Sequence, residues 1–167
     1  MATQTHSEKD AFIQRFDQEY RTHRRVLEGY PPDQLDLKPG EKSKPARDVA
    51  WMLVLNQMVM VPIAKGEELK PGSFPKSTGT LLEMITALDQ HHVEAMRVLR
   101  ESDESVWNQS LTMPVGPKQM GQMKRSDALW FFFFDAIHHR GQLTVYSRIA
   151  GGKVPSIYGP TADEPWS

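Results

Sequence analysis

The sequence contains no cysteine among its 167 residues. Disulfide bonds and zinc sites built from thiolates are therefore excluded, and so is catalysis by a cysteine of the chain itself. An excess of charge of one sign is also lacking, because 20 Lys and Arg residues face 21 Asp and Glu residues. This balance argues against a broad basic surface, and we expect no nucleic-acid partner.

Long apolar runs are absent as well. The first twelve residues, MATQTHSEKDAF, are polar and lack the apolar segment of a signal peptide or an anchor. The run of four phenylalanines at 131–134 is too short, and too closely flanked by charge, to cross a bilayer. We therefore expect no membrane contact and a cytoplasmic protein that forms a single domain over residues 1–167.

Apolar residues recur at steps of three and four, which is typical of helices with one buried face. This spacing predicts a first helix over about 9–27 and a third over 81–99, which Thr80 would cap. Residues 45–64 are apolar nearly all round, as expected for a second helix buried in a bundle. Pro62 should bend this helix or end it early, because it removes a backbone donor.

A fourth helix is predicted from a cap at Ser126 to about Ala150, where two glycines follow. Residues 102–124 are expected to form a long loop, with a short extended piece at 111–115. The segment 153–167 is polar and rich in proline, which indicates an extended C-terminal tail. Four helices without strand periodicity predict an all-α fold, a four-helix bundle with long loops.

Asp135 and His139 lie one turn apart on the apolar face of the predicted fourth helix. This spacing suits two ligands of one metal ion, or an acid and a base that share a proton. A structural hydrogen bond between the two side chains is the alternative, and it stays open. His138 points about 100° away from His139, so the two do not readily bind one ion. Arg140 is expected to be solvated or to bind the tail.

Two segments of the chain resemble the DinB/YfiT group of metalloenzymes, in the order found in that family. They are RRVLEGYPPDQLDLKPGEKSKPARDVAWM, from the end of the first helix to the second, and HHRGQLTVYSRIAGGKVPSIYGPTADEP at the C-terminal end. The resemblance implies a homodimeric four-helix bundle with two long connections. It also implies a divalent metal on three histidines, one from the second helix and two from the fourth.

Carried over to this chain, the ligand positions fall at Met52, Asp135 and His139, so that only one of the three is histidine. A carboxylate oxygen is an ordinary ligand for zinc, nickel, manganese or iron, whereas a thioether is soft and prefers copper(I). Asp48 and Asn56, at helical steps from Met52, are candidates to supply an oxygen instead. A retained but altered metal site and a metal-free pocket both stay open.

Three further histidines are candidate ligands. His23 lies on the apolar face of the first helix and His92 on that of the third, while His138 stands beside the family position. For each of them, the alternative is a histidine that is hydrogen-bonded in the core or at its rim.

The resemblance implies a metal-dependent enzyme of the thiol-dependent transferase or isomerase type, or a hydrolase. Its small-molecule substrate would bind in a pocket between the second and fourth helices. Because the chain has no cysteine, the thiol would be an external one of low molecular weight. Without a metal, Asp135 would orient His139 and raise its basicity, as a general base requires. The alternative is a metal-free, non-catalytic bundle that binds a small apolar ligand or a protein partner.

Overall fold

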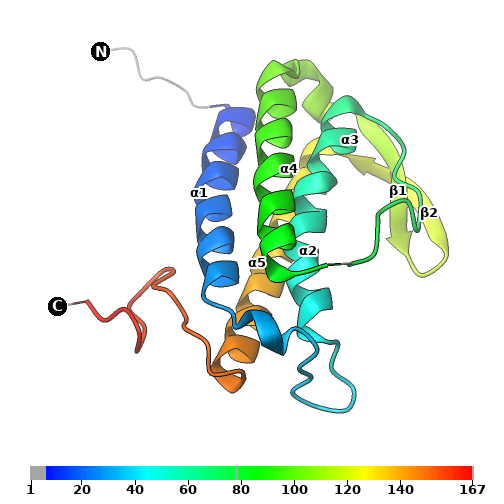
Figure 1. The fold of residues 1–167 in the computed structure, drawn as a ribbon. Coiled ribbons are helices and arrows are strands. Elements are labelled where there is room, and N and C mark those ends of the chain that lie inside the picture. The colour runs from blue at the N-terminus through cyan, green and yellow to red at the C-terminus, as the bar shows by residue number, and fades with distance from the viewer. Residues whose placement is uncertain (1–6, 78, 167) are drawn as a thin grey trace, which may run out of the picture.

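A computed structural model describes residues 7–77 and 79–166 of the chain. Within these residues, four long helices form a bundle in which α4 stands between α1 and α2, with α5 behind them (Figure 1). The long helices are α1 (Glu8–Glu28), α2 (Ala46–Met58), α4 (Leu81–Glu101) and α5 (Arg125–Ile149). The shorter elements are α3 (Met60–Lys65), strands β1 (Ser110–Gly116) and β2 (Gln119–Lys124), and 3-10 helices at Pro32–Gln34 and Glu104–Asn108.

The start of α4 is set by a capping box. The Thr80 side chain accepts a hydrogen bond of 3.3 Å from the Glu83 backbone N–H. In return, the Glu83 carboxylate accepts one of 2.6 Å from the Thr80 N–H. These bonds satisfy two N–H groups that have no partner inside the helix, so the predicted cap is confirmed.

The predicted cap of the last helix is wrong. Helix α5 begins at Arg125, and Ser126 lies inside its first turn with a fully buried side chain. The reason is that β2 ends at Lys124 and runs directly into the helix, so Lys124 occupies the cap position with an extended backbone.

The predicted second helix is divided into two. Helix α2 ends at Met58, and α3 begins two residues later at Met60. Pro62 explains the break, because a proline ring inside a helix crowds the carbonyl group four residues earlier, here that of Met58. The end of α3 is set by Gly66, whose φ of 74° is in the left-handed region.

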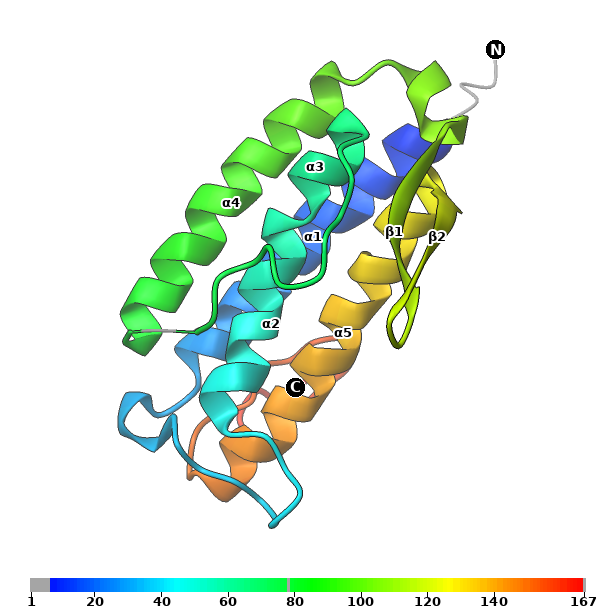
Figure 2. The ribbon, with the colours of Figure 1, turned by 90° about the vertical axis from the view of Figure 1, so that its right-hand side faces the viewer.

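The all-α prediction is wrong in one respect, because the chain also contains a two-stranded antiparallel hairpin, β1 and β2. Strand β1 includes the short extended piece that was predicted, and it buries Leu111 and Met113 on one face. Strand β2 lies in the predicted loop, and its exposed or half-exposed residues show no alternation. The hairpin lies beside the N-terminal half of α5, away from the tail (Figure 2).

The bundle core consists of two apolar clusters with polar side chains between them. One cluster includes Phe12, Leu99 and Phe133, and the other includes Leu27 and Leu53. At the level between the clusters, every long helix contributes a buried polar residue, and we call this set the polar layer. It consists of Glu19 and His23 from α1, Asn56 and Gln57 from α2, His92 from α4 and Arg140 from α5.

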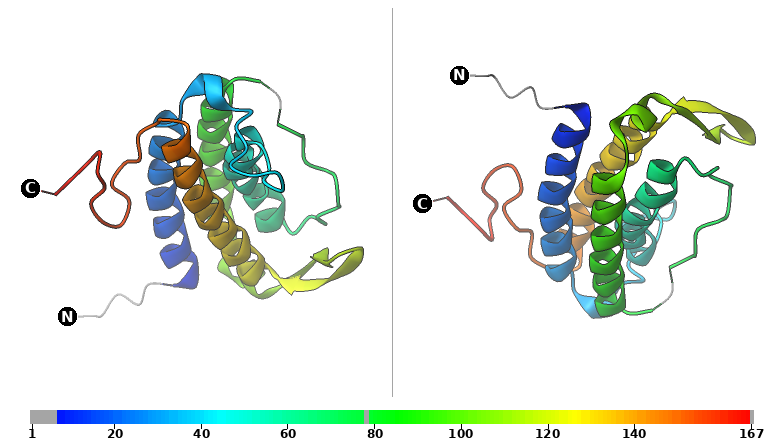
Figure 3. Two further views of the ribbon diagram at one scale, coloured as in Figure 1. Left: turned by 90° about the horizontal axis from the view of Figure 1, so that it is seen from below. Right: turned by 90° about the horizontal axis from the view of Figure 1, so that it is seen from above.

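The tail lies along the outside of α1, on the opposite side of the molecule from the hairpin (Figure 3). Its described part contains no helix or strand, but side chains attach it to the bundle. Arg25 of α1 makes an ion pair of 2.6 Å with Glu164, and Arg148 of α5 makes an ion pair with Asp163. Among the described helices, none is long and apolar enough to span a membrane.

Candidate functional site

Asp135 and His139 meet on α5 where this helix packs against α2. Asp135 Oδ1 lies 3.4 Å from His139 Nε2, and Asp135 Oδ2 accepts a hydrogen bond of 3.0 Å from Asn56 Nδ2 on α2. The Asn56 amide also donates to the Met52 carbonyl oxygen over 2.8 Å. The site is therefore a pair on one helix whose carboxylate is held by an amide from the next.

The neighbouring hydrogen bonds indicate where the protons are. The Gln142 amide nitrogen lies 2.9 Å from His138 Nε2, so this amide donates to His138. Its oxygen lies 3.0 Å from His139 Nδ1, which must therefore carry a proton. Asp135 Oδ1 lies 3.4 Å from the other ring nitrogen, Nε2, so a proton on that nitrogen is paired with the carboxylate.

The contact shifts the pKa values of both side chains. The hydrogen bond to Asp135 raises the pKa of His139 against the opposing effect of burial. Burial alone would raise the pKa of Asp135, but hydrogen bonds from His139 and Asn56 outweigh it, and this pKa is lowered. The two side chains are 14% and 28% exposed for His139 and Asp135 respectively, so a small molecule can reach them.

The site supplies two of the three ligands that the resemblance implies. The 3.4 Å between His139 Nε2 and Asp135 Oδ1 is close to the separation of two ligands bound to a tetrahedral ion at about 2.1 Å. Met52 offers only a thioether, Asn56 turns its amide nitrogen toward the carboxylate, and Asp48 is exposed. Among the described residues, no group of three His, Cys, Asp or Glu side chains is placed to hold a metal. The residues present therefore do not fit a three-ligand centre.

His23 is a core histidine in the polar layer and is only 2% exposed. Its Nδ1–H donates to the Glu19 backbone carbonyl oxygen. Burial, and secondarily the nearby Arg140 charge, lowers the pKa of His23 to about 3. The ring is therefore neutral, and its hydrogen bond is to α1 itself rather than to the site.

In contrast to His23, whose buried Nε2 has no hydrogen-bond partner among the described residues, His92 corresponds to the alternative of a hydrogen-bonded histidine. Its Nε2 lies 3.1 Å from Asp17 and its Nδ1 lies 3.1 Å from Gln57. Its ring stacks on that of Tyr20, with 3.7 Å between the centroids. These contacts, to α1 through Asp17 and to α2 through Gln57, occupy both ring nitrogens of His92. His138, on the outer face of α5, bonds to Gln142, and its ring is exposed.

Arg140 has a larger structural role than its sequence context indicated. The expectation of a solvated side chain is wrong, because Arg140 is 2% exposed and donates to the Glu19 carboxylate inside the bundle. The expectation of tail binding is confirmed, because Arg140 Nη2 also donates to the Tyr158 hydroxyl over 2.7 Å. The Tyr158 hydroxyl in turn donates to Glu19 over 3.0 Å. Glu19 was missed, although an acidic residue on the apolar face of the first helix is a signal for such a partner.

The sequence of the chain matches one curated protein over a short stretch. The Bacillus subtilis protein YrdA is 50% identical to this chain over 43 residues, which are 26% of either protein. The chain thus matches about a quarter of that relative's length.

Solved structures resemble this bundle over most of its length. A DinB-like protein from Bacillus cereus superposes with a TM-score of 0.70 and 20% identity, covering 88% of this chain and 95% of its own. The DinB-like protein YjoA from Bacillus subtilis superposes with a TM-score of 0.69 and 16% identity, covering 89% and 96%. A variant of the mycothiol-dependent maleylpyruvate isomerase gives a TM-score of 0.57 at 13% identity, covering 93% and 68%.

At these identities the superpositions establish the fold alone. The sequence comparison goes further, because the family's pattern matches residues 1–166, nearly the whole chain. On this evidence the chain belongs to the DinB family.

Proposed function

We propose that Asp135 and His139 form a proton-transfer site for a thiol-dependent reaction of the isomerase or transferase type. The observation that carries the proposal is the chain of contacts from α2 to His139: Asn56 donates to Asp135, and Asp135 lies 3.4 Å from His139 Nε2 and raises the pKa of this ring. A general acid or base needs this kind of support, since it fixes the ring and moves its pKa.

The thiol in this proposal comes from outside the chain, because the chain has no cysteine. One structure of similar fold is a mycothiol-dependent isomerase, and this is the ground for naming the thiol class. His139 in its neutral form takes the S–H proton of the thiol. The sulfur then adds to an electrophilic carbon of the substrate, and His139 gives the proton to the neighbouring atom that receives the electron pair. In a transferase this adduct is the product, whereas in an isomerase the C–S bond breaks again and the proton returns to the thiolate through His139. Asp135 stabilises the imidazolium that exists between these two steps.

The proposal assigns no step to a metal ion, because the third ligand position is Met52. A metal-dependent form has one observation in its favour, the 3.4 Å separation between the two remaining donor atoms. Elemental analysis of protein purified without chelator decides between the two forms. Stoichiometric zinc, nickel, manganese or iron would support the metal-dependent one, and substoichiometric metal without uptake on titration would support the metal-free one.

The proton-transfer role is tested by NMR titration of the His139 ring. We expect a raised pKa in the wild-type protein and a lower one in Asp135→Asn, because the hydrogen bond to the carboxylate is its largest cause. Asp127→Asn is the matched control, since Asp127 is an exposed carboxylate two turns earlier on the same helix. An unchanged His139 pKa in Asp135→Asn would contradict the proposal.

The thiol class is tested with mycothiol and with glutathione as probes. The wild-type protein should bind at least one of them and lower the pKa of its thiol, seen as thiolate absorbance, because the imidazolium stabilises a thiolate. His139→Ala should lose this effect, and His138→Ala should keep it. Equal loss in both variants, or no thiol binding in the wild type, would refute the thiol-dependent reaction.

A homodimer is part of the proposal. Val145 and Ile149 on the outer face of α5 are 58% and 54% exposed, and they follow Gly141 at steps of four residues. A Cβ at Gly141 would meet nothing within 4 Å, so a second helix has room to approach there. Light scattering should show a dimer that Val145→Glu dissociates. A wild-type protein that stays monomeric at high concentration would contradict this part.

A further inference from the structure

A hollow of about 320 Å³ opens between α5, β1 and the segment 69–74. This volume is within the usual range for small-molecule pockets, roughly 300–1,000 Å³. Its walls are mostly apolar and come from three parts of the chain that are distant in sequence. They include Phe74, Met113, Pro114, Phe131 and Phe132, with Lys70 as the charged residue among the described lining residues.

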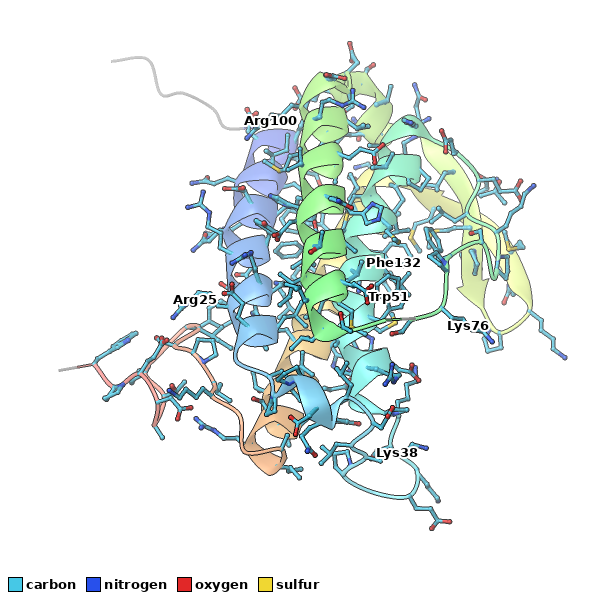
Figure 4. The ribbon with its side chains drawn as sticks, viewed as in Figure 1. Arg25, Lys38, Trp51, Lys76, Arg100 and Phe132 are labelled. Carbon is cyan, nitrogen blue, oxygen red and sulfur yellow. The ribbon has the colours of Figure 1, made fainter. Side chains whose placement is uncertain are left out.

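The walls of this pocket are held in place by hydrogen bonds. The Leu69 N–H donates to the Thr112 carbonyl oxygen over 3.0 Å, which ties the segment 69–74 to β1. Trp51 Nε1 donates to the Pro75 carbonyl oxygen over 2.8 Å, which ties the same connection to α2. Figure 4 shows Trp51 and Phe132 on the side of the bundle that faces the connection carrying Lys76. The pocket is thus a formed feature of the fold.

The pocket lies next to the candidate proton-transfer site. Phe131 and Phe132 precede Asp135 by four and three residues on α5, and residues at these spacings are neighbours on a helix surface. One helical turn, about 5.4 Å along the axis, therefore separates the apolar walls from the carboxylate. A molecule seated in the pocket can extend toward Asp135 and His139.

The rim of the pocket carries a positive charge that an anion can use. The Lys70 side chain is 70% exposed, and its ammonium lies 3.9 Å from the Glu68 carboxylate. An exposed pair at this distance contributes little, so Lys70 is available to a second carboxylate or sulfonate. Glu68 is not among the residues that line the pocket.

We infer that the pocket between α5, β1 and residues 69–74 binds the apolar, ring-sized end of a small organic anion, with Lys70 near its acidic group. The inference rests on the proposed function and names the substrate class of that site. A concave, apolar pocket with one cation at its rim is better suited to such an amphipathic small molecule than to the flat surface of a protein partner.

The test uses two fluorescent probes with the same rings. 8-Anilino-1-naphthalenesulfonate is an anion, and N-phenyl-1-naphthylamine is its uncharged counterpart. Phe131→Ser should weaken the binding of both probes by about tenfold, as loss of an aromatic wall predicts. Phe134→Ser is the matched control and should leave binding unchanged, because Phe134 is equally exposed on α5 but does not line the pocket. Lys70→Gln should weaken only the anionic probe.

Every outcome of these probe-binding measurements either supports the inference or overturns it. Phe131 and Lys70 are more than half exposed, so neither substitution should unfold the protein. Equal loss in Phe131→Ser and Phe134→Ser would overturn the inference, and so would an effect of Lys70→Gln on both probes. A change of molecular mass in Phe131→Ser without a change in probe binding would show that a second copy covers this surface. Asp135→Asn should keep probe binding while it lowers the His139 pKa, so the pocket and the proton-transfer role can fail separately.

Discussion

The buried ion pair between Glu19 and Arg140 allows a quantitative prediction of stability. The two side chains are 10% and 2% exposed, and they join α1 to α5 across the polar layer. Glu19→Gln keeps the shape of the side chain and removes its charge. The Arg140 guanidinium then remains in the core without its anionic partner, with the Tyr158 hydroxyl as its neighbour.

The expected cost follows from this burial. Removing one partner of a buried pair costs about 3–5 kcal/mol, and the lower end applies because glutamine still accepts a hydrogen bond. For a chain of this size each kcal/mol lowers the melting temperature by about 2–4 °C, which gives a loss of about 6–12 °C. Replacing both residues by methionine should recover much of that loss, because no unpaired charge is then left in the core.

Urea denaturation and thermal unfolding followed by circular dichroism measure the effect. Glu101→Gln is the matched control, because the Arg97–Glu101 pair has the same chemistry with side chains 57% and 63% exposed. Its loss should cost only about 0.3–0.5 kcal/mol. If Glu19→Gln and Glu101→Gln destabilise the protein equally, the charges in the polar layer are solvated and the reasoning from burial is refuted.

Three further predictions concern single residues. Thr80→Ala should lower the free energy of unfolding by about 1 kcal/mol in urea denaturation, through loss of the α4 cap, whereas Thr86→Ala in the middle of that helix should not lower it. Met52→His should tighten zinc binding in calorimetry, because it creates a set of two histidines and one carboxylate; unchanged affinity would show that this position lies outside any metal site. In the folded protein the pKa of His23 is lowered from 6.5 to about 3, so as the pH falls the unfolded chain is protonated at His23 before the folded chain is. The free energy of unfolding therefore decreases as the pH falls below 6.5. His23→Gln should remove this loss, at most about 1.4 kcal/mol per pH unit, and equal acid sensitivity of both proteins in urea denaturation would contradict the assignment.

The long helices could be predicted from the sequence because their signals are local. The first and third predicted helices, over 9–27 and 81–99, differ from α1 and α4 by two residues or fewer at each end. An apolar face and a side-chain cap are both encoded within a few residues of the helix they define. The hairpin is different, because β2 gains its structure by pairing with β1 rather than from its own pattern.

The candidate site could also be predicted only in part, because contacts within one helix follow from the sequence whereas contacts between helices do not. The contact between Asp135 and His139 follows from their spacing on one helix, and in the structure Asp135 Oδ1 lies 3.4 Å from His139 Nε2. The donor from Asn56 and the pairing of Arg140 with Glu19 depend on the packing of different helices, and the latter joins residues 121 positions apart. A single sequence shows that such residues are polar, but it does not show which partner they meet.

The hydrogen bonds also show how Asp135 is accommodated at a position where the resemblance implies a histidine ligand. At Asp135, one carboxylate oxygen accepts from the Asn56 amide and the other faces His139 Nε2, so both oxygens have a partner within the protein. An imidazole at the same position would have at most one acceptor atom to offer to these two donors. Asn56 thus complements aspartate at position 135 rather than the histidine that the resemblance implies there. Together with the thioether of Met52, this arrangement favours proton transfer by the pair over the binding of a metal by three ligands.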